Sequence, residues 1–213
     1  MGYKLFYYPG NANLAPHFVL EELGLPYELS LVDRTRNQQK DPDYLRLNPN
    51  GRIPTLVDGE QVLYEAAAIC LHLADRHPQA GLLPDPGTRE RGELYKWLMY
   101  FTNTVQAEAM IYFYPEARSA DESHWPAIKR RAEERLGGWF DNVEAHLAAG
   151  GPYVLGASYS IADCFLFMLG RWGRGLQRPP RALPAFGRFL NLVGERPAIR
   201  RALEQEGLTQ PYF

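Results

Sequence analysis

The first turn of the chain has the residues of an anion site. Pro9-Gly10-Asn11-Ala12-Asn13 separates the aromatic run KLFYY from a stretch with helical spacing. In an open α/β sheet, ligands gather at the carboxyl ends of strands, where the free amides of a helix N-terminus favour an anion. A thiolate held there would have its pKa lowered from about 8.5. The alternative interpretation is that Gly10 only makes a turn and that Asn13 only caps the helix.

A second segment suited to a ligand is Gly51-Arg52-Ile53-Pro54-Thr55. A proline that enters a strand cannot donate to the ladder, so Pro54 belongs at a sheet edge or in a special turn. If the Ile53–Pro54 bond is cis, the backbone of Ile53 is held open to pair with an extended peptide-like ligand. Only about 5–6% of X-Pro bonds in folded proteins are cis, so the residues alone predict an edge or a turn.

The third segment is Tyr64-Glu65-Ala66, where a strand end runs into a helix. The carboxylate of Glu65 suits an ammonium group, and the amides of Ala66 and Ala67 suit a carboxylate. The alternative is a plain strand-to-helix junction.

The sequence lacks the motifs of several other classes of enzyme and binding site. The sequence has no GxGxxG, Walker, HExxH or GxSxG motif, and its 5 histidines include no i, i+4 pair to hold a metal. Cys70 and Cys164 form no CxxC, so neither a zinc site nor a disulfide framework is predicted. With 23 Lys and Arg against 25 Asp and Glu, the formal charge of −2 provides no basic surface for nucleic acid or anionic lipid.

The chain also shows no signal for a membrane or for secretion. No segment is long and apolar enough to span a bilayer, and the first apolar run is too short for a secretory signal. We therefore expect a cytoplasmic protein that binds neither nucleic acid nor membranes.

Alternating strand and helix signals position the three segments within residues 1–80. Strands are predicted at 4–8, at 27–32 and on both sides of Asp58-Gly59, which is a strong hairpin signal. Helices are predicted at 14–23, with Gly24 as its stop, and at 66–75, and a polar stretch with a weak helix signal runs to Leu45. The order β-α-β-α-β-β-α indicates a mixed sheet with helices packed against it.

From about Pro86 the pattern is entirely helical. Apolar residues repeat at helical spacing up to Pro115 and again over 128–147, and two shorter helices are predicted at 184–193 and 197–203. Ser160-Ile161-Ala162-Asp163 is a capping box before a buried helix. The fold class is therefore α/β plus all-α, with an α/β domain at residues 1–80, a Pro- and Gly-rich linker at 81–87 and an all-α domain at 88–213.

Taken in order, these segments resemble a cytosolic glutathione transferase, closest to the bacterial beta class. The resemblance covers nearly the full length and is carried by KLFYYPGNANLAPH, LNPNGRIPTL, LYEAAAICLHLAD, YSIADCFLF followed by RW, and FGRFLNLVGERPAIRRAL. It implies a thioredoxin-like N-terminal domain, a helical C-terminal domain, a homodimer, and glutathione as co-substrate without a metal.

The resemblance also implies how glutathione is held. The backbone of Ile53, before a cis Pro54 and beside Arg52, would pair with the cysteinyl part of glutathione. Glu65 and the backbone of Ala66 would hold the γ-glutamyl end. The capping box is implied to serve folding.

The chain departs from the beta class at its catalytic positions. Ala12 stands where that class carries a cysteine, and Met99 and Gln106 stand where it carries an Asn and a His. Ala66 replaces its usual serine, which a binding role of the amide tolerates. A mechanism through a mixed disulfide on the enzyme is therefore not expected.

Two kinds of donor remain near the expected sulfur. Asn13, with Asn11, is predicted to donate a hydrogen bond to the thiolate, and the phenol of Tyr8 is the alternative donor. An amide donates but cannot act as a base, so it would stabilise the thiolate and not remove its proton.

An electrophile site is expected between the domains, from the resemblance and because pockets commonly form there. Tyr112, Trp172 and Gln106 are predicted to line it, together with Phe113 and Tyr114. The alternative is that Phe113 and Trp172 belong to the core.

Three functions follow from these residues. The first is transfer of glutathione to a small apolar electrophile. The second is a glutathione-dependent disulfide or peroxide reductase that works without an enzyme cysteine. The third is a non-catalytic binding protein of the same fold, against which the presence of Ile53-Pro54 and Glu65 argues.

Overall fold

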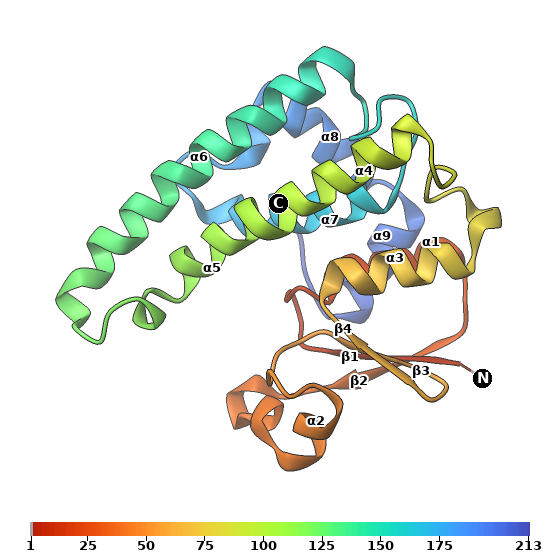
Figure 1. Cartoon of the computed structure of the whole chain (residues 1–213). Coiled ribbons are helices and arrows are strands. Elements are labelled where there is room, and N and C mark those ends of the chain that lie inside the picture. The colour runs from red at the N-terminus through yellow and green to blue at the C-terminus, as the bar shows by residue number, and fades with distance from the viewer. Residues whose placement is uncertain (1) are drawn as a thin grey trace. The chain divides into compact units, whose positions relative to one another are not determined.

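The computed structural model describes residues 2–213, which form two compact units (Figure 1). The first unit comprises the chain up to Leu83 together with Gly194–Tyr212, and the second comprises Pro84–Val193 and Phe213. No helix within residues 2–213 is long and apolar enough to cross a membrane.

The first unit is built on a four-stranded mixed sheet in the order β2-β1-β3-β4. Its strands are β1 (Tyr3–Tyr7), β2 (Tyr27–Leu31), β3 (Thr55–Asp58) and β4 (Gln61–Tyr64). β1 pairs parallel with β2 and antiparallel with β3, and β3 forms the predicted hairpin with β4. Leu5 and Leu56, which pair across β1 and β3, are both fully buried and face the core.

Helices cover both faces of this sheet. The helices of the unit are α1 (Leu14–Leu23), α2 (Pro42–Leu47), α3 (Ala66–Arg76) and α9 (Pro197–Gln205), with short helical turns η1 (Arg34–Arg36), η2 (Gln38–Lys40) and η3 (Pro78–Ala80). Figure 1 shows α1 and α3 on one face and α2 on the other. α1 ends at Gly24, whose left-handed backbone (φ 63°) makes the predicted stop. The predicted thioredoxin-like α/β fold is confirmed.

The C-terminal segment belongs to a different unit from the one that the sequence predicts. Residues 88–213 were predicted to form the helical domain, but α9 packs against α1 in the first unit. The apolar side of α9 is buried, and two ion pairs tie this segment to α1: Arg196 to Glu22 and Arg201 to Glu21, both at 2.6 Å. Helical periodicity shows that α9 has an apolar face, but it does not show which partner covers that face.

The second unit is all-helical. Its helices are α4 (Arg89–Tyr100), η4 (Phe101–Gln106), α5 (Ala107–Phe113), α6 (Trp125–Gly150), α7 (Ile161–Trp172) and α8 (Pro184–Gly194), with short turns η5 (Pro115–Ala117), η6 (Glu122–His124), η7 (Gly173–Gly175) and η8 (Pro180–Ala182). The helix predicted to run to Pro115 is continuous but contains η4, a π-helical segment that widens its middle. α7 is buried from Ile161 to Arg171 and forms the core of the unit.

The predicted capping box at the start of α7 is confirmed. The Ser160 hydroxyl accepts from the N–H of Ala162 (3.2 Å), and Asp163 accepts from the N–H of Ser160 (2.8 Å). Asp163 also accepts from the N–H of Val154 at 2.8 Å, which ties the preceding loop to the helix.

We expect Ser160→Ala to lower the free energy of unfolding by about 1 kcal/mol, the usual effect of losing an N-cap. Asp163→Ala should lower it further, because two buried N–H groups lose their acceptor at about 1–3 kcal/mol each. Denaturant unfolding measures both. Equal stability of the two variants would contradict the role assigned to Asp163.

Candidate functional site

The loop before β3 presents an open piece of extended backbone. The Ile53–Pro54 peptide bond is cis. The carbonyl of Arg52 accepts from the Tyr44 hydroxyl (2.6 Å) and from the Asn48 amide (2.9 Å), and these two hydrogen bonds hold the loop in place. Within residues 2–213, neither the N–H nor the C=O of Ile53 has a hydrogen-bond partner. The backbone of Ile53 is therefore available to an extended ligand.

Glu65 holds an unusual backbone conformation at the start of α3. It has φ 73° and ψ 110°, which for a residue other than glycine stores about 1–3 kcal/mol of strain. Its side chain is exposed, makes no capping hydrogen bond and has no ion-pair partner among residues 2–213. The N–H groups of Ala66 and Ala67 lie in the first turn of α3, where helix amides lack internal acceptors. A carboxylate and free amides thus lie side by side, as a ligand with an ammonium and a carboxylate requires.

The structure places Asn13 inside the turn that joins β1 to α1. The side chain of Asn13 is fully buried, accepts from the N–H of Tyr8 (3.2 Å) and donates to Glu206 (2.7 Å). Asn13 occupies the N-cap position of α1, but its side chain makes no capping bond, so the alternative interpretation of a capping side chain is wrong. Both ends of the amide instead hold the turn together.

Glu206 is a buried carboxylate beneath this turn that sequence reasoning missed. It follows α9 and accepts from the N–H of Gly10 (2.9 Å) and from Nδ1 of His17 (2.8 Å), besides Asn13. The side chains of Glu206 and His17 are both fully buried. Burial and the charge of Glu206 together raise the pKa of the Tyr7 phenol. No short-range pattern could have identified Glu206, because its partners lie nearly the whole chain away.

Tyr8 and Asn11 lie on the solvent side of the same turn, where Arg34 of η1 contacts both. Nη1 of Arg34 donates to Oδ1 of Asn11 at 2.8 Å, and Cζ of Arg34 lies 6.0 Å from the centroid of the Tyr8 ring. The Tyr8 hydroxyl makes no hydrogen bond to any other described residue, so it is available as a donor. The structure therefore brings the two predicted donors Tyr8 and Asn11 together.

Neither cysteine can serve as a nucleophile at this site. Cys70 in α3 and Cys164 in α7 have no exposed surface, and burial raises the pKa of the Cys70 thiol. The part of the chain that the structure describes holds no group of three or more possible metal ligands. A thiolate acting here must therefore arrive with the ligand.

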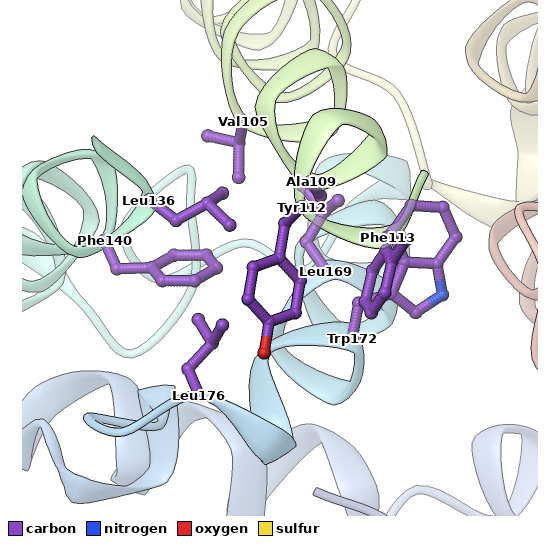
Figure 2. A pocket seen from close by; sticks show the side chains of 10 residues that line it. Val105, Ala109, Tyr112, Phe113, Leu136, Phe140, Leu169, Trp172 and Leu176 are labelled. Atoms are coloured by element: carbon purple, nitrogen blue, oxygen red, sulfur yellow. The ribbon is translucent and has the colours of Figure 1, made fainter. Parts of the chain in front are cut away.

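The predicted aromatic wall lies in the helical unit (Figure 2). Tyr112, Phe113 and Trp172 line one hollow. The rings of Phe113 and Trp172 pack edge to face, with their centroids 6.1 Å apart. The hollow has an interior volume of about 10 Å³, enough for about one water molecule, so its own side chains fill it. Phe113 is nevertheless 41% exposed. Gln106 is not part of this lining and lies at the end of η4.

Comparison with known proteins agrees with this geometry. Residues 1–75 match the family model for the N-terminal domain of glutathione S-transferase. The chain is similar to a glutathione S-transferase of Xanthomonas campestris, at 34% identity over 209 residues, covering 96% of this chain and 99% of the relative. It is similar to the beta-class enzyme of Sphingomonas chungbukensis (30% identity, TM-score 0.85) and to a sphingomonad glutathione S-transferase complexed with glutathione (31%, TM-score 0.84). Each of these two alignments covers 97% of this chain and 100% of the other.

Proposed function

The chain belongs to the glutathione S-transferase family and takes glutathione as its co-substrate, and we propose that it stabilises the glutathione thiolate for attack on a small apolar electrophile. The observation that carries the proposal is the open backbone of Ile53 before the cis Pro54, in the same unit as the exposed carboxylate of Glu65. These features match the two polar halves of a γ-glutamyl-cysteinyl peptide.

In this proposal Ile53 pairs with the cysteinyl backbone, and Arg52 and Pro54 hold the loop that presents it. Glu65 binds the γ-glutamyl ammonium, and the N–H of Ala66 binds the γ-glutamyl carboxylate. The strained backbone of Glu65 supports this role, because strain of that kind persists where the surrounding structure holds it for function.

The sulfur then lies at the turn before α1. The side-chain donors near it are the Tyr8 hydroxyl and the Asn11 amide, which has two N–H groups and donates one of them to the carbonyl of Pro9 at 3.4 Å. Asn13 acts through its backbone N–H, which has no acceptor among the residues described, and through the turn that its buried side chain supports. Donors held in place before the reaction stabilise the thiolate without reorganising.

Tyr112, Trp172 and Gln106 are the residues that we propose for the electrophile pocket. Burial and the charge of Glu133 raise the pKa of the Tyr112 phenol, so this group stays protonated and can donate to a polar group of the electrophile. The exposed ring of Phe113 beside Trp172 provides an apolar contact surface.

We expect Trp172→Leu to raise KM for a nitro-activated aryl chloride roughly twofold to tenfold, since an aromatic pair is worth about 0.5–1.5 kcal/mol beyond its buried area. KM for glutathione should stay unchanged. Leu192→Ala, an exposed apolar residue outside the hollow, is the matched control. If Trp172→Leu lowers the melting temperature but leaves KM for the electrophile unchanged, Trp172 belongs to the hydrophobic core and not to the electrophile pocket.

A titration of the purified protein with glutathione and with glutathione disulfide tests the function. We expect the reduced form to bind, with a thiol pKa below its value in water, read from heat and from the ultraviolet band of the thiolate. Preferential binding of the disulfide would favour the function of a glutathione-dependent reductase over that of a transferase. Absence of binding of either form at millimolar concentration would favour a non-catalytic binding protein.

We also propose that the protein is a cytoplasmic homodimer, as the family resemblance implies. Large apolar side chains are exposed on β4 (Val62 and Tyr64) and on α4 (Tyr95 and Met99), which supports burial of these surfaces in a partner. Light scattering during size-exclusion chromatography tests the stoichiometry.

A further inference from the structure

Arg34 is fixed on the turn at which the sulfur of glutathione is expected. It begins η1 directly after β2, and the Asp33 side chain caps that turn by accepting from the N–H of Thr35. Its guanidinium donates from Nη1 to Oδ1 of Asn11 at 2.8 Å, and its Cζ lies 6.0 Å from the centroid of the Tyr8 ring. Asn11 and Tyr8 belong to the turn between β1 and α1.

A thiolate at this turn needs a positive charge nearby. The carboxylate of Glu206 lies beneath the turn and accepts from the N–H of Gly10, so a second negative charge close by is disfavoured. The buried amide of Asn13 already donates to Glu206. The dipole of α1 favours an anion more weakly than one charged hydrogen-bond partner does.

We propose that Arg34 supplies the positive charge that stabilises the thiolate of bound glutathione, with Asn11 and Tyr8 positioning its guanidinium. This inference rests on the proposed function. A guanidinium is always protonated, so it cannot take the proton of the thiol, which leaves to solvent. It favours the ionised sulfur through charge alone. An opposite charge within about 4–6 Å lowers a pKa by about 1–3, and the partial exposure of Arg34 places the effect near the lower end.

The glycyl carboxylate of glutathione is the other anion that this guanidinium could meet, and S-methylglutathione separates the two cases. This analogue keeps both carboxylates but has no ionisable thiol. If Arg34 stabilises the thiolate, replacing it leaves the affinity for S-methylglutathione unchanged. If Arg34 binds the glycyl carboxylate, replacing it weakens that affinity.

The experiment compares Arg34→Ala and Arg34→Lys with Arg36→Ala. Arg36 lies on the same helical turn, is exposed and makes no contact with Tyr8 or Asn11 among the interactions described, so it is the matched control. The ultraviolet absorbance of bound glutathione is titrated against pH, and the Kd of S-methylglutathione is measured by calorimetry.

We expect Arg34→Ala to raise the pKa of the bound thiol by about 1, which lowers the thiolate fraction at neutral pH roughly tenfold. Arg34→Lys should recover part of the effect, because it keeps the charge but loses the guanidinium that contacts Asn11 and the Tyr8 ring. Arg36→Ala should behave as the unchanged protein, and all variants should bind S-methylglutathione equally.

Two results would overturn the inference in different ways. An unchanged thiol pKa in Arg34→Ala, with or without weaker binding of S-methylglutathione, removes Arg34 from the thiolate but leaves the proposed function standing. Failure of the unchanged protein to bind either ligand removes the proposed function, and the inference with it.

Discussion

Replacing Glu65 by glutamine should weaken glutathione binding roughly tenfold to a hundredfold, because a hydrogen bond to a charged group contributes about 1.5–3 kcal/mol. The Glu65 carboxylate is exposed and has no ion-pair partner among residues 2–213, so the ammonium of the ligand would be its counter-charge. Solvent exposure favours the lower part of this range. Calorimetric titration measures the change, and Glu60→Gln, an exposed carboxylate in the β3–β4 turn, is the control.

The backbone of Glu65 allows a sharper version of the same experiment. Glycine adopts a positive φ at no steric expense, so Glu65→Gly should raise the free energy of unfolding by about 1 kcal/mol while it abolishes the ion pair with the ligand. Stability and binding would then change in opposite directions. A variant that loses both would show that Glu65 is structural and would remove it from the glutathione site.

Local patterns were sufficient to predict most elements of this fold. The helix predicted at 14–23 is α1 with the same ends, because Gly24 stops it, and the hairpin around Asp58-Gly59 forms as expected. The capping box before α7 also forms as expected, since all its groups lie within four residues. Signals of this kind are complete within one segment and need no knowledge of the rest of the chain.

The residues that hold the site in place could not be predicted from local patterns. The Asn13 side chain was predicted to donate to the thiolate, with capping of α1 as the alternative, but it is buried and bonds to Tyr8 and Glu206. Arg34 reaches Asn11 from η1, which follows β2, so its position depends on the parallel pairing of β1 with β2. Residues that contact the ligand carry chemistry that can be recognised along the sequence, whereas those that hold them in place are identified only by the packing.

Glu206 is the residue of this support whose replacement should have the largest effect on stability. Its buried carboxylate accepts from Gly10, Asn13 and His17, so three donors on the turn and on α1 converge on one side chain. Each buried donor left without its acceptor costs about 1–3 kcal/mol, so the three together cost roughly 3 kcal/mol or more. We expect a loss of this size in Glu206→Ala, measured by denaturant unfolding.

Glu206→Gln should lose less, because its oxygen still accepts from two of the three donors while its own NH₂ faces the third. Glu204→Gln, an exposed carboxylate on α9, is the matched control and should unfold as the unchanged protein does. If Glu206→Ala is as stable as Glu204→Gln, the buried network contributes nothing to the fold.

A double-mutant cycle with His17 separates this network from the general cost of changing a buried side chain. His17 and Glu206 lie 2.8 Å apart with no exposed side-chain surface, so the loss in the double variant His17→Gln, Glu206→Gln should be smaller than the sum of the single losses by about 0.5–3 kcal/mol. The same variants should weaken glutathione binding, because Glu206 fixes Gly10 at the turn expected to receive the sulfur. Purely additive losses, with binding unchanged in the folded fraction, would show that the C-terminal segment stabilises the first unit without positioning its site.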